Sequence, residues 1–129
     1  MFSVPGRDER LRNKDEVLAI RFQGFPDEQL AISADYLNEH RVYQTRVGSI
    51  DAVVLTDTSG ANRVYETRGR QFAVWDGEDA VSDDGGTIWR VTESALVRED
   101  GPQRLRRLPA QRAFWFGWYS AYPGTRLVR

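Results

Sequence analysis

Cysteine is absent from this sequence of 129 residues, which also has only one histidine, one lysine and one methionine. Without cysteine, the chain has no disulfide bond, catalytic thiol, iron–sulfur ligand or zinc finger. Any Ser-His-Asp triad would depend on His40, and no serine lies in a Gly-x-Ser-x-Gly motif. A zinc site built on one histidine is equally poorly supported, so we expect His40 to cap a short helix or lie on the surface. The sequence therefore predicts no catalytic residue, no metal site and no cofactor.

Long apolar runs are missing as well. No stretch approaches the roughly 20 apolar residues that span a bilayer, and residues 1–14 lack the apolar core of a signal peptide. We expect no transmembrane segment and a cytoplasmic location for the chain as written, although an exported parent protein and peripheral membrane association are compatible with this composition.

A strong charge of one sign is the third absence. The net charge is −1, which provides no broad basic field for a phosphate backbone. Residues 104–112 do combine arginine with the start of an aromatic run, as grooves for single-stranded nucleic acid do. The alternation of exposed Arg104 and Arg106 with Leu105 would equally suit a half-exposed edge strand, on which charged side chains prevent aggregation. We favour the edge strand and do not expect nucleic-acid binding.

The length is that of one domain, and 40% hydrophobic with 29% charged residues is ordinary for a folded protein. Residues 1–15 are charged and aperiodic, which predicts an N-terminal arm. Residues 16–129 are expected to form a single globular domain.

Short alternating segments separated by glycine turns predict a mainly β fold. In the first segment Leu18, Ile20 and Phe22 share one face, and Ser33 suits the N-cap of a short helix near residues 34–39. The strand-like segments are residues 17–22, 29–32, 41–47, 52–56, 63–67, 72–75, 87–92, 95–98 and 104–108. This pattern predicts an α+β, mainly β domain with a curved antiparallel sheet or partial barrel of six to nine strands.

An acidic, glycine-rich segment occupies residues 76–86. Clustered carboxylates can hold calcium, but the spacing does not match the calcium-binding loop of about twelve residues. Gly85-Gly86 precedes a strand rather than a helix, so a hairpin turn is expected there instead of a phosphate site. We interpret the whole segment as a solvated loop.

The last element is unusually aromatic. Pro109 suits a first helical position and Pro123-Gly124 would end the element, which predicts a C-terminal aromatic helix at residues 110–121. At helical spacing Phe114 and Trp118 share one face, and Phe116 points away from it. A helix that is apolar around so much of its circumference must be covered on more than one side. The main interpretation is that it plugs the open face of the sheet and forms most of the core.

Residues 86–125 contain four segments that resemble those of one known family. The segments are the strand Gly86–Glu93, the basic segment Leu105–Pro109, the run Arg112–Trp118 and the tail Tyr122–Thr125. Together they resemble the C-terminal part of domain of unknown function 3179, a bacterial and archaeal family with a D-x-x-[TG]-x-x-W strand, an R-A-F-W-F-x-W helix and a P-x-T tail. A looser likeness at Arg7–Leu11 and Lys14–Val17 extends the resemblance over nearly the whole chain. The family has no established activity, so the resemblance implies a fold and no function.

One departure from the family pattern bears on chemistry. Many members carry a Cys-Pro-x-Cys-type motif after the central strand, an obvious place for metal or redox chemistry. The matching stretch here, Leu55–Ala61, contains no cysteine. Any chemistry of that motif is therefore absent from this chain.

Two functions are compatible with the sequence. The leading hypothesis is a non-catalytic protein-binding or scaffold domain, an accessory subunit of a larger assembly, because tyrosine and tryptophan pair an apolar body with a polar tip. Its partner surface would be Phe116, Tyr119 and Tyr122. The alternative is a small-ligand domain, enzymatic or not, with a pocket between the sheet and the C-terminal helix. That pocket would be lined by Trp75, Trp89, Glu93, Arg112, Trp115 and Trp118.

Overall fold

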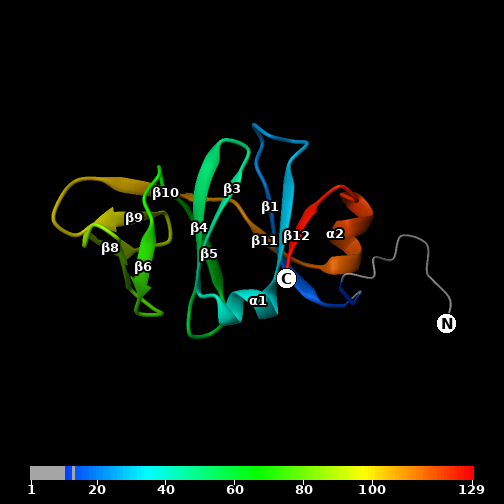
Figure 1. Ribbon diagram of the computed structural model, residues 1–129, viewed down its shortest axis with the longest axis horizontal. Helices are drawn as coiled ribbons and strands as arrows, with labels where there is room; N and C mark the ends of the chain where they lie inside the picture. Colours follow the sequence, from blue (N-terminus) through cyan, green and yellow to red (C-terminus); the bar gives the residue numbers. More distant parts are fainter. Residues whose placement is uncertain (1–10, 13) are drawn as a thin grey trace.

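Two β-sheets and two short helices form the part of the chain that the computed structural model describes, residues 11–12 and 14–129 (Figure 1). Most of the predicted N-terminal arm, residues 1–15, lies outside the described residues.

The smaller sheet has four strands in the order β11-β1-β2-β12. Their bounds are β1 Glu16–Arg21, β2 Gln29–Ser33, β11 Gln111–Phe114 and β12 Arg126–Val128. Strand β1 pairs antiparallel with β2 and β11, and β12 runs parallel to β2. Side chains alternate along β1, so Leu18 and Ile20 point to one face and Val17 and Ala19 to the other. All four are buried, so this sheet is covered on both faces.

The larger sheet has eight strands in the order β3-β4-β5-β10-β9-β8-β7-β6. Their bounds are β3 Val42–Val47, β4 Ile50–Thr56, β5 Asn62–Glu66, β6 Phe72–Trp75, β7 Ala80–Asp83, β8 Ile88–Val91, β9 Ala95–Arg98 and β10 Arg104–Leu108. Every neighbouring pair in it is antiparallel. The sheet curls until its edge strands β3 and β6 lie close together, so it forms a nearly closed barrel.

Side chains join the two edges of the barrel. Gln44 on β3 donates from Nε2 to the Arg70 carbonyl at 2.9 Å and accepts from the Phe72 N–H at 2.6 Å. At the other end, the Trp75 indole on β6 donates to the carbonyl of Thr56 on β4, the strand next to β3, at 2.8 Å. Within the described part of the chain, no backbone hydrogen bond links β3 to β6. We call this junction the seam.

Strand β4 belongs to two cores at once. Its Val53 and Leu55 point into the barrel, whose interior is filled by apolar side chains from seven strands: Val53, Leu55, Tyr65, Phe72, Val81, Trp89, Leu96 and Leu105. Its Ala52 and Val54 point outward and pack against the four-stranded sheet. The residues of that sheet and its flanking loop in this layer are Leu18, Ile20, Phe22, Leu30 and Ile32. A strand buried on both faces reads as a continuous apolar run, which explains residues 52–55.

The two helices cover apolar surface that the pairing of the two sheets leaves exposed. Helix α1, Ala34–Glu39, follows β2 directly and buries Leu37 between the sheet and the barrel. Helix α2, Trp115–Ala121, packs Trp115 and Trp118 on the other face of the four-stranded sheet, against Val17, Ala19 and Ala31. Along the long axis in Figure 1 the order is therefore barrel, four-stranded sheet and α2.

The mainly β, α+β fold class is confirmed, and so is the helix at residues 34–39. The Ser33 hydroxyl accepts from the Tyr36 N–H at 3.3 Å, as expected of an N-cap. The curled antiparallel sheet has eight strands, within the predicted six to nine. The described residues form twelve strands in all, because there is a second sheet, and β7, β11 and β12 are the ones not predicted. The prediction of a solvated loop at residues 76–86 is wrong, because β7 pairs with β6 and β8 and Asp83 is buried.

The C-terminal helix is present but starts later than residue 110. Gln111–Phe114 form β11, because they pair with β1, and the helix begins at Trp115. It covers one sheet face, whereas the largest core groups fill the barrel and the layer beside it, so the helix does not form most of the core. Strand β10 has the predicted alternation around buried Leu105 but lies between β5 and β9, so it is not an edge strand.

Candidate functional site

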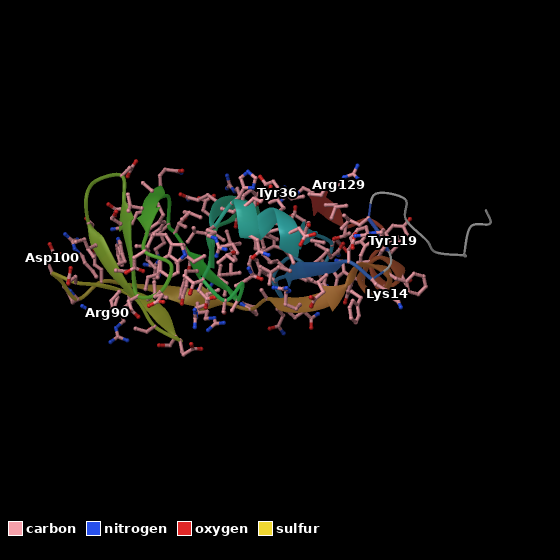
Figure 2. The ribbon with its side chains drawn as sticks, turned by 90° about the horizontal axis from the view of Figure 1, so that it is seen from below. Lys14, Tyr36, Arg90, Asp100, Tyr119 and Arg129 are labelled. Carbon is pink, nitrogen blue, oxygen red and sulfur yellow. The ribbon has the colours of Figure 1, made fainter. Side chains whose placement is uncertain are left out.

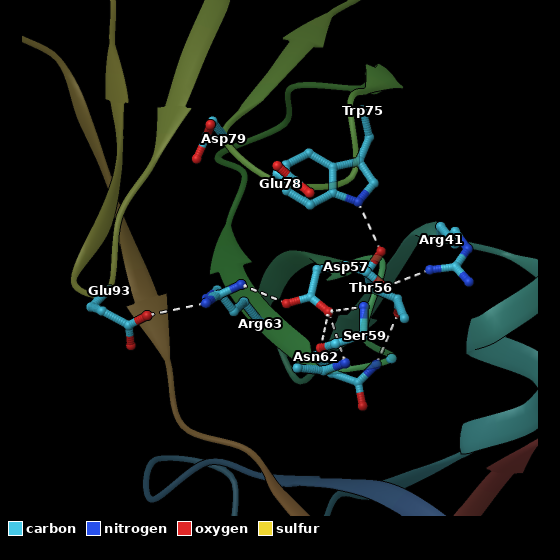
Figure 3. Close-up of polar contacts among 12 residues, drawn as sticks. Arg41, Thr56, Asp57, Ser59, Asn62, Arg63, Trp75, Glu78, Asp79 and Glu93 are labelled. Atoms are coloured by element: carbon cyan, nitrogen blue, oxygen red, sulfur yellow. Dashed lines mark hydrogen bonds and ion pairs between the residues drawn. The ribbon is translucent and has the colours of Figure 1, made fainter.

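Charged side chains gather at one end of the barrel. Strands β4, β6 and β8 all end there, and the turns that follow them are residues 57–61, 76–79 and 92–94. Backbone hydrogen bonds tie these turns together, from the Thr58 N–H to the Gly77 carbonyl at 3.2 Å and from the Val91 N–H to the Asp79 carbonyl at 2.7 Å. We call this end the barrel mouth, and Figure 3 shows its polar contacts.

Asp57 organises the first of these turns. Its Oδ1 accepts from the Ser59 N–H at 2.9 Å, the Ser59 hydroxyl at 2.6 Å and the Ala61 N–H at 3.0 Å. The pKa of Asp57 therefore lies below its usual value, with the Ser59 hydroxyl as the main cause and partial burial opposing it. The Oδ2 atom is left to receive Arg63 Nη1 at 3.3 Å.

Two arginines from neighbouring strands meet at Glu93. Arg63 on β5 places Nη2 3.2 Å from Glu93 Oε1, and Arg107 on β10 places Nη1 2.9 Å from Glu93 Oε2. The same Arg107 nitrogen donates to the Glu93 carbonyl at 3.2 Å. Each carboxylate oxygen of Glu93 is thus bound by a different guanidinium, and the chain Asp57–Arg63–Glu93–Arg107 is one ionic network (Figure 3 draws its first three members).

These ion pairs stabilise the charged forms of their side chains and therefore do not favour proton transfer. Hydrogen bonds from Arg63, and then from Arg107, lower the pKa of Glu93. Burial lowers the pKa of Arg63, but the hydrogen bond to Glu93 and the nearby carboxylates outweigh it and the net pKa is raised. General acid–base catalysis needs a pKa near neutrality, and these shifts move both groups away from it.

The Trp75 side of the mouth opens into a groove. Trp75 is half-buried, and Arg41 Nη1 donates to the Asp57 carbonyl beside it. The groove follows the seam, has a volume of about 590 Å³ and is lined by Arg41, Val42, Thr58, Ala73, Trp75, Asp76 and Gly77.

Five of the six predicted pocket residues lie in three separate places. Trp75 and Glu93 are both at the barrel mouth, and Glu93 points to its arginines (Figure 3). Trp89 is fully buried inside the barrel, where its indole donates to Asp83 Oδ2 at 3.1 Å. Trp115 and Trp118 lie under α2.

Arg112 connects the two sheets. From β11 it donates to Asn62 Oδ1 at 2.7 Å and to the Gly60 carbonyl at 3.3 Å, in the turn between β4 and β5. It also lies 3.6 Å from Glu16 on β1. The structure therefore does not bring the six predicted pocket residues around one cavity.

The predicted partner surface lies on α2 and the residue that follows it. Helix α2 is at one end of the long axis of the molecule and the barrel is at the other (Figures 1 and 2). Phe116 is 37% exposed, and Tyr119 and Tyr122 are half-buried. Phe114, which helical spacing placed on the same face as Trp118, is 61% exposed because it ends strand β11 instead. We call Phe114 and Phe116, with the outer edges of Tyr119 and Tyr122, the aromatic end.

A small groove runs between α2 and the four-stranded sheet. Its volume is about 270 Å³ and it is lined by Ala19, Arg21, Pro109, Ala110, Gln111, Trp118 and Tyr122. The Arg21 guanidinium lies 5.1 Å from the centre of the Tyr122 ring, a cation–π contact. Of the residues that the sequence assigned to a pocket, Trp118 is the one that lines this groove.

Among residues 11–12 and 14–129, no group of three or more histidine or acidic side chains is placed to hold a metal ion. In that same part of the chain, no helix has the length and apolar character needed to cross a membrane.

Sequence reasoning missed the ionic network and the exposure of Phe114. Arg63 and Glu93 are 30 residues apart, and only the order of strands in the barrel brings them together. One local signal was available, because Arg63 and Tyr65 share a strand face, and so do Leu105 and Arg107. Each pair places an arginine next to a core residue at the end of a strand, where the barrel mouth must lie.

The family model described as "Protein of unknown function (DUF3179)" matches residues 1–125. No curated protein and no solved structure shows significant similarity to the chain. The match spans all four segments that carry the sequence resemblance, from the strand at Gly86 to the tail at Thr125. The chain therefore belongs to the family Protein of unknown function (DUF3179).

Proposed function

We propose that this domain is a non-catalytic protein-binding module that acts as an accessory subunit of a larger assembly. The observation that carries the proposal is the exposure of two phenylalanine rings two positions apart in the sequence, Phe114 at 61% and Phe116 at 37%. Tyr119 and Tyr122, later in the same aromatic run, are half-buried. Aromatic residues gathered in this way are typical of protein interfaces.

The energetics favour burial of this surface by a partner. Fully burying a phenylalanine side chain contributes about 1.5–3 kcal/mol, so two rings supply a large part of a moderate binding free energy. Tyr122 already packs on Trp118, with ring centres 4.5 Å apart, and Trp115 packs on Tyr119 at 5.5 Å. The surface is thus backed by a rigid layer, which reduces the entropy lost on binding.

A variant pair tests this proposal. The double variant Phe114→Ser/Phe116→Ser removes both rings, and Val74→Ser is the matched control because Val74 is 67% exposed on the barrel strand β6. Each immobilised chain is exposed to native extract, with folding checked by circular dichroism. We expect partners retained by the native chain and by the control to be lost from the double variant. Equal retention by all three chains would contradict the proposal.

A second candidate function rests on the groove between α2 and the sheet. Arg21 faces this groove beside the Tyr122 ring, and Trp118 and Gln111 complete a mixed apolar and polar lining. This composition suits a small aromatic acid. Anilinonaphthalene sulfonate is a suitable fluorescent probe, and Arg21→Ala should weaken its binding while Arg104→Ala, on the barrel surface, should not. Equal weakening by both variants would exclude the groove as the site.

A further inference from the structure

The two arginines at the barrel mouth are aligned by the sheet itself. Strands β5 and β10 are antiparallel, with Arg107 directly opposite Tyr65. Side chains opposite each other share a face, and so do residues two apart on one strand. Arg63, Tyr65 and Arg107 therefore all point to the inner side of the barrel. Tyr65 is buried there, which leaves the two guanidinium groups at the rim of the interior.

The geometry around Glu93 is that of a bound carboxylate. Its two oxygens are held by two different arginines, at 3.2 Å and 2.9 Å. The Glu93 side chain itself is 80% exposed, whereas that of Arg63 is 25% exposed. The arginines are thus the fixed part of the arrangement, and the glutamate reaches them from the solvent side of a turn.

The local charge selects the kind of anion that fits. Arg63 and Arg107 carry two positive charges, and Asp57, 3.3 Å from Arg63, supplies one negative charge. Without Glu93 these three side chains have a net charge of +1. One carboxylate brings the sum to zero, whereas a phosphate dianion would leave excess negative charge beside Asp57.

We propose that Arg63 and Arg107 form a carboxylate-binding site at the barrel mouth, and that Glu93 is a built-in competitor which the carboxylate of a ligand displaces. The site uses none of the residues of the aromatic end and does not depend on the function proposed above.

Displacement of Glu93 is physically reasonable. Exposed ion pairs contribute at most about 1 kcal/mol each, because water solvates both partners and the long side chains lose entropy. The turn itself does not need the Glu93 carboxylate, since Arg107 also donates to the Glu93 carbonyl and Tyr65 donates its hydroxyl to the Thr92 carbonyl at 2.6 Å. The glutamate can therefore leave while the rim of the barrel keeps its shape.

Removal of the competitor provides the test. In Glu93→Ala the site should be vacant, and sodium acetate should bind at least about tenfold more tightly than to the native chain, where an intramolecular carboxylate competes. Binding is followed by the NMR shifts of nitrogen-labelled arginine side chains at constant ionic strength. Glu93→Gln serves as a second variant that keeps the side-chain volume. Glu99→Ala is the matched control, because Glu99 is an exposed carboxylate paired with Arg90 at 3.4 Å.

Three results would overturn the proposal. The first is acetate binding to Glu93→Ala that is no tighter than to the native chain or the Glu99→Ala control. The second is binding that persists in Glu93→Ala/Arg107→Gln. The third is phosphate binding as tight as acetate binding, which would contradict the charge argument.

The origin of the carboxylate is decided by comparing two probes on Glu93→Ala. One is free acetate and the other is a peptide with both ends capped and a single glutamate. Tighter binding of acetate assigns the site to small-molecule acids, and tighter binding of the peptide assigns it to an acidic side chain of a protein. Failure of both probes would also overturn the proposal.

Discussion

Asp83 shows how a single buried carboxylate can organise a turn and a core residue together. Its Oδ1 accepts from the Gly85 and Thr87 N–H groups at 3.0 Å and 2.9 Å, and its Oδ2 accepts from the Trp89 indole at 3.1 Å. Arg70 lies 3.8 Å from Oδ2 and 5.1 Å from the centre of the Trp89 ring. The Asp and Trp of the D-x-x-[TG]-x-x-W pattern are therefore hydrogen-bonded partners, which gives that family motif a structural role in this chain.

Asp83→Asn should destabilise the domain. The substitution removes the charge that faces Arg70 and replaces one acceptor oxygen with an amide. A buried donor left without its acceptor costs about 1–3 kcal/mol, and we expect that loss in the free energy of unfolding measured with urea. The adjacent Asp84→Asn is the control, because Asp84 is exposed. If the two variants lose equal stability, the hydrogen bonds of Asp83 are not responsible.

Asp76 makes the stability of the β6–β7 turn depend on pH. Its Oδ1 accepts from the N–H groups of Glu78, Asp79 and Ala80, which lower the pKa of Asp76, with Glu78 as the first cause. An unfolded aspartate titrates at about 3.9. A lower pKa in the folded state means that the stabilisation is fully present above that pH and is lost as the pH falls through the folded pKa.

Comparison with Asp76→Asn isolates this titration. The difference in unfolding free energy between the native chain and Asp76→Asn should be constant above about pH 5 and shrink as the pH falls below about 4. Urea unfolding across this range measures it. A difference that does not change with pH would show that the charge of Asp76 contributes nothing to the turn.

At the scale of elements, the sequence correctly predicted those whose conformation depends on contacts between residues close together in the chain. Ser33 caps helix α1 through a bond to a residue three positions away, so the sequence located that helix correctly. Strand β11 could not be found in this way, because Gln111–Phe114 has apolar spacing compatible with a helix. Its pairing with β1, about 95 residues earlier in the chain, decides its conformation. Strand β12 depends in the same way on β2.

The ionic network at the barrel mouth likewise could not be predicted in full, because part of it joins residues that are far apart in the sequence. Short polar contacts such as the Asp57–Ser59 turn are visible in the sequence as an Asp-x-Ser-Gly pattern. The meeting of Arg63 with Glu93 requires the order of β5, β10, β9 and β8 in the sheet. The exposure of Phe114 likewise follows from strand β11 and not from its residue type.

At the seam, side chains rather than paired strands join β3 to the β6 edge. Gln44 supplies both a donor and an acceptor to the opposite edge. In Gln44→Met the side-chain size is kept, but the Phe72 N–H loses its acceptor. We expect amide exchange at Phe72 to accelerate about tenfold, which corresponds to one net hydrogen bond. Gln71→Met, at an exposed position, is the control, and unchanged exchange in Gln44→Met would mean that the seam is held by other contacts.

At the scale of the whole molecule, the barrel and the four-stranded sheet share their cores through single strands. Strand β4 fills the barrel with Val53 and Leu55 and packs against the sheet with Ala52 and Val54. Strand β1 likewise faces the barrel with Leu18 and α2 with Val17. Neither sheet can lose its order without exposing apolar surface of the other, so the molecule should unfold as one cooperative unit.

Two core variants and three reporter residues test this cooperativity. Leu55→Ala empties a position inside the barrel and Leu30→Ala empties one between the sheet and the barrel, both fully buried. Each should lower the free energy of unfolding by about 2–5 kcal/mol. Fluorine-labelled tryptophan separates the signals of Trp89 in the barrel from those of Trp115 and Trp118 under α2 by NMR. We expect all tryptophans to report the same denaturation midpoint, and each variant to shift every signal equally. If Leu55→Ala shifted Trp89 alone, β4 would not couple the two cores, and the barrel and the sheet would be separate folding units.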